Sequence, residues 1–349
     1  MVTVRAPVRI SFGGGGTDLE AYYGRFGGFV VSAAITRYAY VTARPSADGG
    51  IQIISADYRL REHYPPGLLP EVTEPLTLPK AAVERFAAQG LLEQGVDLFL
   101  ASEVPPGTGL GSSSAMTVAL VAALGAYLGL SFAPAELAEE ASRLEIERLA
   151  MPIGKQDQYA SAFGGLNALT FRDTGTEVRP LALAGGQRQA LARRLLLFST
   201  GSSRHSAEIL RQQRSDTRRK PAVTAALHQL KELAAAMQAA LEGGALDEFG
   251  ALLDVAWQEK KRLSGKISNA GIDTAYQAAR AAGALGGKIT GAGGGGFLLL
   301  YCPPRRQSAV RAVMGELGLC ELTFDLSRTG VEVVSGAVVD ELPVPVPGD

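Results

Sequence analysis

The chain has 349 residues, of which 46% are hydrophobic and 20% charged, and its formal net charge at pH 7 is −1. This composition is typical of a globular protein with a large core, and the length favours two domains or lobes. The balanced charge argues against a nucleic acid or a membrane surface as partner. The two cysteines lack metal-ligand spacing, and the N-terminus lacks the apolar core of a signal peptide, so we expect a cytoplasmic protein.

The first part of the chain is rich in predicted strands. Alternating residues with many Val and Ile side chains predict extended structure. These strands are expected at residues 2–12, 29–45, 50–58 and 96–104. A tight glycine loop follows the first strand at residues 13–16, and a helix is expected at residues 78–89. Strands clustered at the start, with helices later, favour two α+β lobes over a doubly wound sheet.

The second part is mostly helical. Residues 134–150 predict an amphipathic helix, and a loop, a short helix and a strand follow it. Residues 172–186 are polar and rich in turn formers, which makes them the best boundary between lobes, so we expect domains at residues 1–180 and 181–349. Later elements are expected as a strand at 190–201, helices at 206–263, 273–282 and 307–317, and an edge strand at 332–339.

The stretch around which the chain is organised lies at residues 104–130, where a glycine-rich loop leads through serines into an apolar run. Such a loop can bind an anion, because glycine lets the backbone approach closely and the first N–H groups of a helix lack partners. An ordinary capped helix would have the same pattern. The loop does not have the spacing of a Walker motif or of a dinucleotide fingerprint.

Several charged side chains are candidates for chemistry. Asp157 follows Lys155 in the string GKQDQY, where a cation can keep a carboxylate ionised as a general base requires, although an N-capping role is equally compatible. Glu145 is either a solvated helix carboxylate or, with a loop serine, a ligand of Mg²⁺. Arg204, with Ser202 and Ser203 and with Lys260 or Lys261, could form a second anion site.

Three glycine-rich segments in this order resemble those of the GHMP small-molecule kinases, a family of two-lobed α+β enzymes with the active site in the cleft. The segments are APVRISFGGGGTD at 6–18, PPGTGLGSSSA at 105–115 and KITGAGGGG at 288–296. The resemblance implies Asp157 as catalytic base, Arg9 and Lys155 as candidates to assist it, and Mg²⁺ bound by Ser113 and Glu145. The residues implied in ATP binding are Pro106, Gly107, Gly109, Leu110, Gly111, Ser112, Ser113, Ser114 and Ala115. Those expected to bind the substrate are Gly14, Gly15, Thr17, Asp18, Arg204, Gly293 and Gly294.

Within this family, the segments SFGGGGTDL and GKQDQYASAFGG are most similar to those of one branch. The enzymes of that branch phosphorylate the anomeric hydroxyl of D-glycero-D-manno-heptose 7-phosphate and form the 1,7-bisphosphate. The string GGGGT at residues 13–17 replaces the Gly-Glu-His-Thr of galactokinases. The expected partner is therefore a small-molecule sugar or sugar phosphate, with a monomer or homodimer as assembly. A kinase for an unphosphorylated sugar (mannose, fucose, galactose or an amino sugar) and a non-catalytic nucleotide- or sugar-binding protein are the alternatives.

Overall fold

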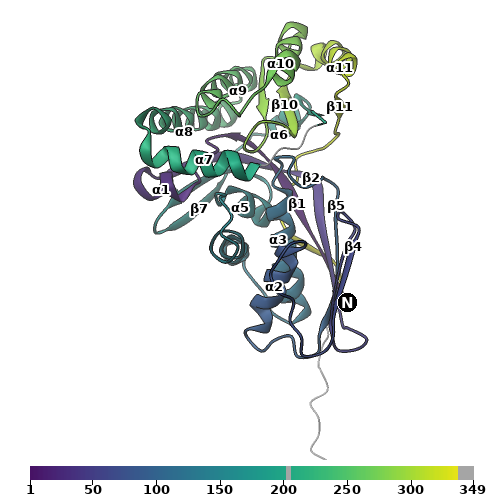
Figure 1. Ribbon diagram of the computed structural model, residues 1–349. Coiled ribbons are helices and arrows are strands. Elements are labelled where there is room, and N and C mark those ends of the chain that lie inside the picture. Colours follow the sequence, from purple (N-terminus) through teal and green to yellow (C-terminus); the bar gives the residue numbers. More distant parts are fainter. Residues whose placement is uncertain (202–205, 337–349) are drawn as a thin grey trace, which may run out of the picture.

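Two long antiparallel strands, β1 (Val2–Gly13) and β2 (Gly28–Arg44), form the centre of the N-terminal half. Figure 1 shows the protein as a computed structural model, which describes residues 1–201 and 206–336. The second part of β1 is buried on both faces, which accounts for its continuous run of apolar side chains. Because β1 leads directly into the glycine loop at residues 13–16, that loop lies in the middle of the molecule.

The sheet around these strands has eight members, and β2 organises it. The other strands are β3 (Ile51–Ser55), β4 (Leu60–Tyr64), β5 (Val96–Ser102), β6 (Leu166–Arg172), β7 (Gly175–Pro180) and β12 (Glu332–Gly336). The C-terminal part of β2 pairs with β5 and its N-terminal part pairs with β6, while β1 lies along the other side of β2. Strand β12, from the far end of the chain, pairs with β1 at the edge of this first sheet.

Helix α3 (Ser112–Tyr127) packs on β1 and β2 and is the most buried helix of this half. Its neighbours in the chain are α1 (Glu20–Phe26), α2 (Thr77–Ala87), α4 (Pro134–Ser142) and α5 (Gln156–Phe163). The single helix predicted at 134–150 is only partly correct, because α4 passes into a turn of π-helix at Arg143–Arg148. Such wide turns occur frequently at functional sites, and this one carries Glu145.

The C-terminal half contains an antiparallel sheet in the order β11-β8-β10-β9, covered by helices (Figure 1). The strands are β8 (Leu195–Ser199), β9 (Gly286–Ile289), β10 (Phe297–Tyr301) and β11 (Cys320–Glu321). The helical elements are α6 (Gln187–Ala192), α7 (Ser206–Arg219), α8 (Pro221–Glu242), α9 (Leu246–Lys261), α10 (Ala270–Ala282), the 3₁₀ turn Pro304–Arg306 and α11 (Gln307–Glu316). The α+β class expected from the sequence is confirmed.

Two local predictions are wrong. The strand expected at 190–201 is preceded by α6 and occupies only Leu195–Ser199. The segment 172–186 was expected to be a polar connection, but it contains strand β7, which pairs with β6. Most side chains of β7 are exposed, so its sequence has the polar character of a loop. The division of the chain after residue 180 remains a proposal.

The two halves meet along β1. Helix α8 contacts both β1 and β2, and the ammonium group of Lys288 on β9 donates hydrogen bonds to the carbonyls of Ser11 (2.9 Å) and Phe12 (3.1 Å). Beside them, the hydroxyl of Thr290 donates to the carbonyl of Thr108 at 3.2 Å. These contacts bring the glycine-rich loops of the two halves together.

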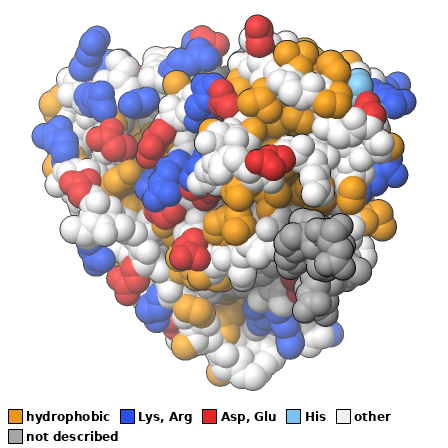
Figure 2. Space-filling view, turned by 90° about the horizontal axis from the view of Figure 1, so that it is seen from below, with side chains coloured by type: hydrophobic (Ala, Val, Ile, Leu, Met, Phe, Trp, Pro, Cys, Tyr) orange, Lys and Arg blue, Asp and Glu red, His pale blue; other side chains and the backbone are white. Residues whose placement is uncertain are grey.

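The outer surface mixes charges of both signs. On the face drawn in Figure 2, Lys and Arg side chains alternate with Asp and Glu, with apolar groups in small areas between them. Of the helices in residues 1–201 and 206–336, none combines the length and the apolar character needed to cross a membrane.

We expect Leu124→Ala to destabilise the protein strongly. Leu124 lies on α3 and is fully buried, so its truncation leaves a cavity under the sheet, at a typical cost of about 2–5 kcal/mol. Leu68→Ala is the matched control, since 54% of its surface is exposed, and it should change stability by less than about 0.5 kcal/mol. Urea denaturation followed by circular dichroism measures both, and equal effects of the two variants would contradict the assigned core.

Candidate active site

A pocket between the two halves contains most of the residues proposed for the site. It lies where the end of β1, the loop before α3, the π turn and the start of α5 meet α7, α9 and the loop between β9 and β10. The proposed residues that line it are Arg9, Gly15, Asp18, Gly107, Gly109, Gly111, Ser112, Ser113, Ser114, Glu145 and Asp157.

Other proposed residues do not line this pocket. They are Pro106, Leu110, Ala115, Gly14, Thr17, Lys155, Gly293 and Gly294. Thr17 has a structural contact instead, because its hydroxyl donates to the carbonyl of Gly14 at 2.7 Å and is fully buried. Arg204, Ser202 and Ser203 lie outside the described residues.

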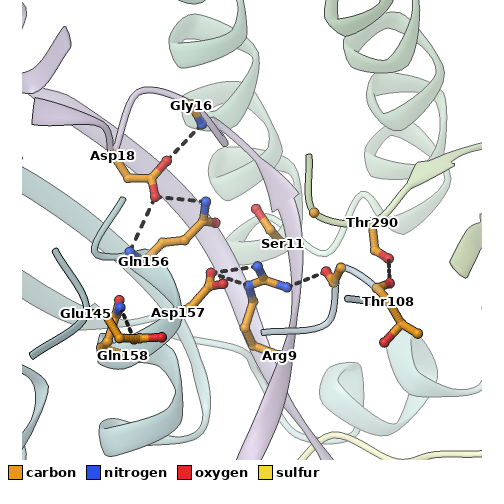
Figure 3. A network of polar contacts seen from close by, with 12 residues as sticks. Arg9, Ser11, Gly16, Asp18, Thr108, Glu145, Gln156, Asp157, Gln158 and Thr290 are labelled. Atoms are coloured by element: carbon orange, nitrogen blue, oxygen red, sulfur yellow. Dashed lines mark hydrogen bonds and ion pairs between the residues drawn. The ribbon is translucent and has the colours of Figure 1, made fainter. Parts of the chain in front are cut away.

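The centre of the pocket is an ion pair between β1 and α5. The side chain of Arg9 is only 4% exposed, and it forms an ion pair with Asp157. Oδ1 of Asp157 lies 2.8 Å from Nε and 2.6 Å from Nη2 of the guanidinium. Its Nη1 donates to the carbonyl of Gly109 at 2.7 Å (Figure 3). The backbone N–H of Arg9 donates to the carbonyl of Leu110 at 2.9 Å. One side chain thus holds both the carboxylate and the glycine loop in place.

Lys155, the other cation considered beside Asp157, has a different partner. Its ammonium group pairs with the carboxylate of Glu139 at 3.0 Å, and the hydroxyl of Tyr159 donates to that same carboxylate. Between the two basic residues, the geometry therefore favours Arg9 as the one that orients Asp157.

The glycine-rich loop enters α3 in the form expected of an anion site. Gly107, Gly109 and Gly111 have φ values of 77°, 79° and 75°, in the region that favours glycine. Gly111 is the residue before the helix, and no side chain caps the helix start. The alternative of an ordinary capped helix is thus disfavoured, since the N–H groups of the first turn have no side-chain acceptor at the cap.

Glu145 is fully buried at the bottom of the pocket. Its carboxylate accepts hydrogen bonds from the hydroxyl of Ser113 at 3.0 Å and from the amide of Gln158 at 2.6 Å (Figure 3 draws the contact with Gln158). Burial raises the pKa of Glu145 to about 7, and the charge of Asp157 adds to this while the hydrogen bonds oppose it. The solvated carboxylate considered from the sequence is therefore not what the fold contains.

Asp18 occupies the other side of the pocket and is also buried. Its carboxylate accepts from the backbone N–H of Gly16 at 2.8 Å and from the amide of Gln156 at 3.0 Å (Figure 3). Burial, helped by the charge of Asp157, raises the pKa of Asp18 in spite of these hydrogen bonds. A carboxyl group held in this way can accept hydrogen bonds from ligand hydroxyls.

The pocket also contains residues that the sequence did not single out. Gln213 on α7 and Gln156 at the start of α5 belong to this group, and Lys288 was noted only as a neighbour of the third glycine loop. Gln158 does not line the pocket, but its amide donates to the carboxylate of Glu145. The amphipathic pattern of α7 gave no signal for Gln213, because a polar residue on a helix is ordinarily exposed.

Two models of one protein family match the chain, one in part of each half. Residues 77–165 match the GHMP kinases N terminal domain, and residues 236–318 match the family described as GHMP kinases C terminal. The chain is a GHMP kinase. The glycine-rich loop before α3 and Asp157 both lie within the match to the N-terminal domain, and the family implies ATP as phosphoryl donor.

Individual relatives of this GHMP kinase cover nearly its full length. The D-glycero-alpha-D-manno-heptose 7-phosphate kinase of Campylobacter jejuni is 29% identical over 95% of this chain and 99% of its own. A crystal structure of a D-glycero-D-manno-heptose 1-phosphate kinase from Bacteroides thetaiotaomicron superposes with a TM-score of 0.81 at 28% identity, covering 97% of this chain and 100% of that one. The galactokinase of Lactococcus lactis, at 20% identity and a TM-score of 0.78 over 95% of each chain, has the same fold.

We expect Asp18→Asn to flatten the pH dependence of the free energy of unfolding. The pKa of Asp18 in the folded kinase is above its ordinary value of 3.8. Its contribution to stability is therefore fully present below that value and is lost as the pH rises through the raised pKa. Asparagine does not ionise, so the variant lacks this loss. The measurement is urea denaturation between about pH 4 and about pH 8.

The control for this prediction is Asp48→Asn. Asp48 is exposed, and its hydrogen bonds, first the one from the backbone of Gly50, lower its pKa to about 2. Its contribution is complete above its ordinary pKa, so the substitution should leave the slope over this range unchanged. Slopes that agree between wild type and Asp18→Asn would contradict the burial of an ionisable Asp18.

Proposed function

We propose that this GHMP kinase transfers the γ-phosphoryl group of ATP to a sugar hydroxyl. The acceptor in this proposal is the anomeric hydroxyl of D-glycero-D-manno-heptose 7-phosphate, and the product is the 1,7-bisphosphate. The observation that carries the proposal is the carboxylate of Asp157, fixed by Arg9 between a glycine-rich helix start and the buried Asp18.

In the proposed reaction the bond between the γ-phosphorus and the bridging oxygen of ATP breaks as the acceptor oxygen bonds to that phosphorus. Asp157 accepts the proton of the acceptor hydroxyl, and ADP is the leaving group. Phosphoryl transfer depends mainly on in-line positioning and on stabilising charge, so few protein groups need to react. The pairing of Asp157 with Arg9 supports this role, because it fixes the carboxylate in one orientation inside the pocket.

The residues at the helix start fit a magnesium ion. Glu145 is buried and, in the part of the chain that the structure describes, no cation pairs with its carboxylate, so a divalent ion would supply the missing positive charge. Ser113 and Glu145 would hold the ion, which binds through few protein ligands when phosphates complete its shell. When bound, Mg²⁺ neutralises charge on the phosphates of ATP. No cluster of three or more His, Cys, Asp or Glu residues offers another metal site within the described ranges.

The choice of acceptor is supported by two relatives that match almost end to end. One is named for heptose 7-phosphate and the other for heptose 1-phosphate, and both names specify a heptose that carries phosphate. Asp18 and the glycine loop beside it leave a polar wall that suits sugar hydroxyls. Both observations favour a phosphorylated sugar as the acceptor.

The deciding assay is ADP release with Mg·ATP against a panel of acceptors. The panel contains heptose 7-phosphate, sedoheptulose 7-phosphate, mannose, mannose 6-phosphate, fucose, galactose and N-acetylmannosamine. Turnover confined to heptose 7-phosphate supports the full proposal. Turnover of a free sugar alone retains the kinase and rejects the phosphorylated acceptor, and tight ATP binding with no turnover at all favours a non-catalytic binding protein.

We expect Asp157→Asn to lower kcat by about 10²–10⁴-fold with the Kd for ATP nearly unchanged, because the variant keeps the shape of the side chain and loses the proton acceptor. Steady-state kinetics and nucleotide titration measure these two quantities. Asp173→Asn is the matched control at an exposed position and should retain wild-type kcat. A kcat for Asp157→Asn within a few-fold of wild type would reject the base assignment.

We expect Glu145→Gln to raise the Mg²⁺ concentration that gives half-maximal activity by at least about tenfold, since an amide oxygen is a weaker ligand than a carboxylate. The measurement is a Mg²⁺ titration of initial rates at a fixed concentration of ATP. Glu147→Gln, the same substitution at an exposed site on the π turn, should leave the titration unchanged. Coinciding titrations for wild type and Glu145→Gln would remove Glu145 from the magnesium site.

A further inference from the structure

Two buried lysines of the C-terminal half face the pocket without an acidic partner. Lys260, in the last turn of α9, is 7% exposed, and Lys288, on β9, is 5% exposed. In residues 1–201 and 206–336, neither forms an ion pair with a carboxylate. Lys260 donates to the carbonyl of Gly291, and Lys288 donates to two carbonyls at the end of β1. An ammonium group buried in this way is costly unless an anion compensates it.

The electrostatics of the pocket favour the binding of an anion. Burial lowers the pKa of Lys260 to about 8, and the neighbouring charge of Arg9 adds to this effect while Asp18 opposes it. Burial also lowers the pKa of Lys288 well below its usual range, with the charge of Lys260 as the next cause. The three cations thus repel one another across the pocket, which binding of an anion would relieve.

Two further hydrogen-bond donors among the residues that line this pocket have no partner in the described structure. They are Nε2 of Gln213 on α7 and the hydroxyl of Ser11 on β1, and both atoms are buried. Buried polar atoms are almost always satisfied, so an unsatisfied pair beside two lysines indicates a ligand. An ammonium group has three donors and Lys260 uses one of them, so several donors remain for one acceptor group.

Gly15 provides the space for such a ligand. A Cβ atom added at Gly14 would lie 1.9 Å from the carbonyl oxygen of Phe29. Gly14 and Gly16 also have φ values of 81° and 98°, so the backbone itself favours glycine at these two positions. At Gly15 the nearest atom would be the hydroxyl of Ser11, at an ordinary 3.5 Å, and φ is not positive. Folding therefore does not explain the glycine at position 15, and the unfilled space beside Ser11 belongs to the pocket.

We propose that Lys260, Lys288 and Gln213 form an anion subsite for a phosphate group that the acceptor already carries. The terminal oxygens of a phosphate monoester accept several hydrogen bonds at once, which matches the convergence of these donors with Ser11. The subsite rests on the proposed function, since it extends the proposed acceptor site.

The subsite lies on the side of Asp157 away from Glu145. In the view of Figure 3, Glu145 and Ser11 lie to either side of Asp157. In this proposal the phosphate of the acceptor binds beside Ser11, and the phosphates of ATP bind at the serines at the start of α3.

The test compares a sugar phosphate with the same sugar lacking phosphate, heptose 7-phosphate against heptose, in wild type and Lys260→Met. We expect the variant to raise KM for the phosphorylated acceptor by about 10–100-fold, with the KM values for heptose and for ATP within about threefold of wild type. Lys260→Arg, which retains the charge, should recover part of the loss. Equal increases in KM for ATP and for the acceptor would overturn the subsite and leave the kinase proposal standing.

Lys261→Met is the matched control. Lys261 is the next residue on α9, but it turns toward Asp273 at 3.5 Å and lies over the ring of Trp257. The same substitution there should leave the preference for the phosphorylated acceptor unchanged. A loss of preference as large as that of Lys260→Met would attribute the effect to general charge and overturn the subsite.

A second experiment separates the subsite from catalysis. Calorimetric titration of heptose 7-phosphate into the full-length protein without ATP measures binding whether or not turnover occurs. Binding to wild type that weakens at least about tenfold in Lys260→Met supports the subsite even if the panel finds no kinase activity. Binding that is absent in wild type, or equal in both proteins, overturns it.

Discussion

One buried guanidinium connects the parts of the active site. Arg9 comes from the central strand β1, and it binds the carboxylate of Asp157 at the start of α5 and the carbonyl of Gly109 in the loop before α3. A buried guanidinium must satisfy its donors, so the positions of these partners are fixed relative to each other. The distance from the proposed base to the proposed phosphate site therefore follows from a strand and not from a flexible loop.

The close approach of two glycine loops is the second constraint. A Cβ atom at Gly291 would lie 2.5 Å from Cα of Gly109, and one at Gly296 would lie 2.2 Å from the carbonyl of Thr108. Only glycine permits this contact, which joins the two halves at the edge of the pocket. The glycines that the sequence places in three clusters thus have different roles, since some are needed for packing, whereas Gly15 lines the pocket and has room for a Cβ atom.

Much of the fold and part of the site could be predicted from the sequence. The alternating pattern located β1 and β2, and the apolar run after the serines located α3. The π turn that buries Glu145 was missed because its residues have an ordinary helical pattern, in which Glu147, two positions on, is exposed. Strand β7 was missed because it lies at the edge of the sheet and is polar on its outer face.

By itself, the sequence determined most of the helices and strands, the order of the three glycine-rich segments and, through them, the family. Local backbone preferences and hydrophobic periodicity are properties of neighbouring residues, so they can be read without a fold. Only the tertiary structure decided that Arg9 and not Lys155 holds Asp157, since Arg9 and Asp157 are 148 positions apart in the chain. The same holds for Lys260 and Gln213, because burial and missing partners depend on which distant segments pack together.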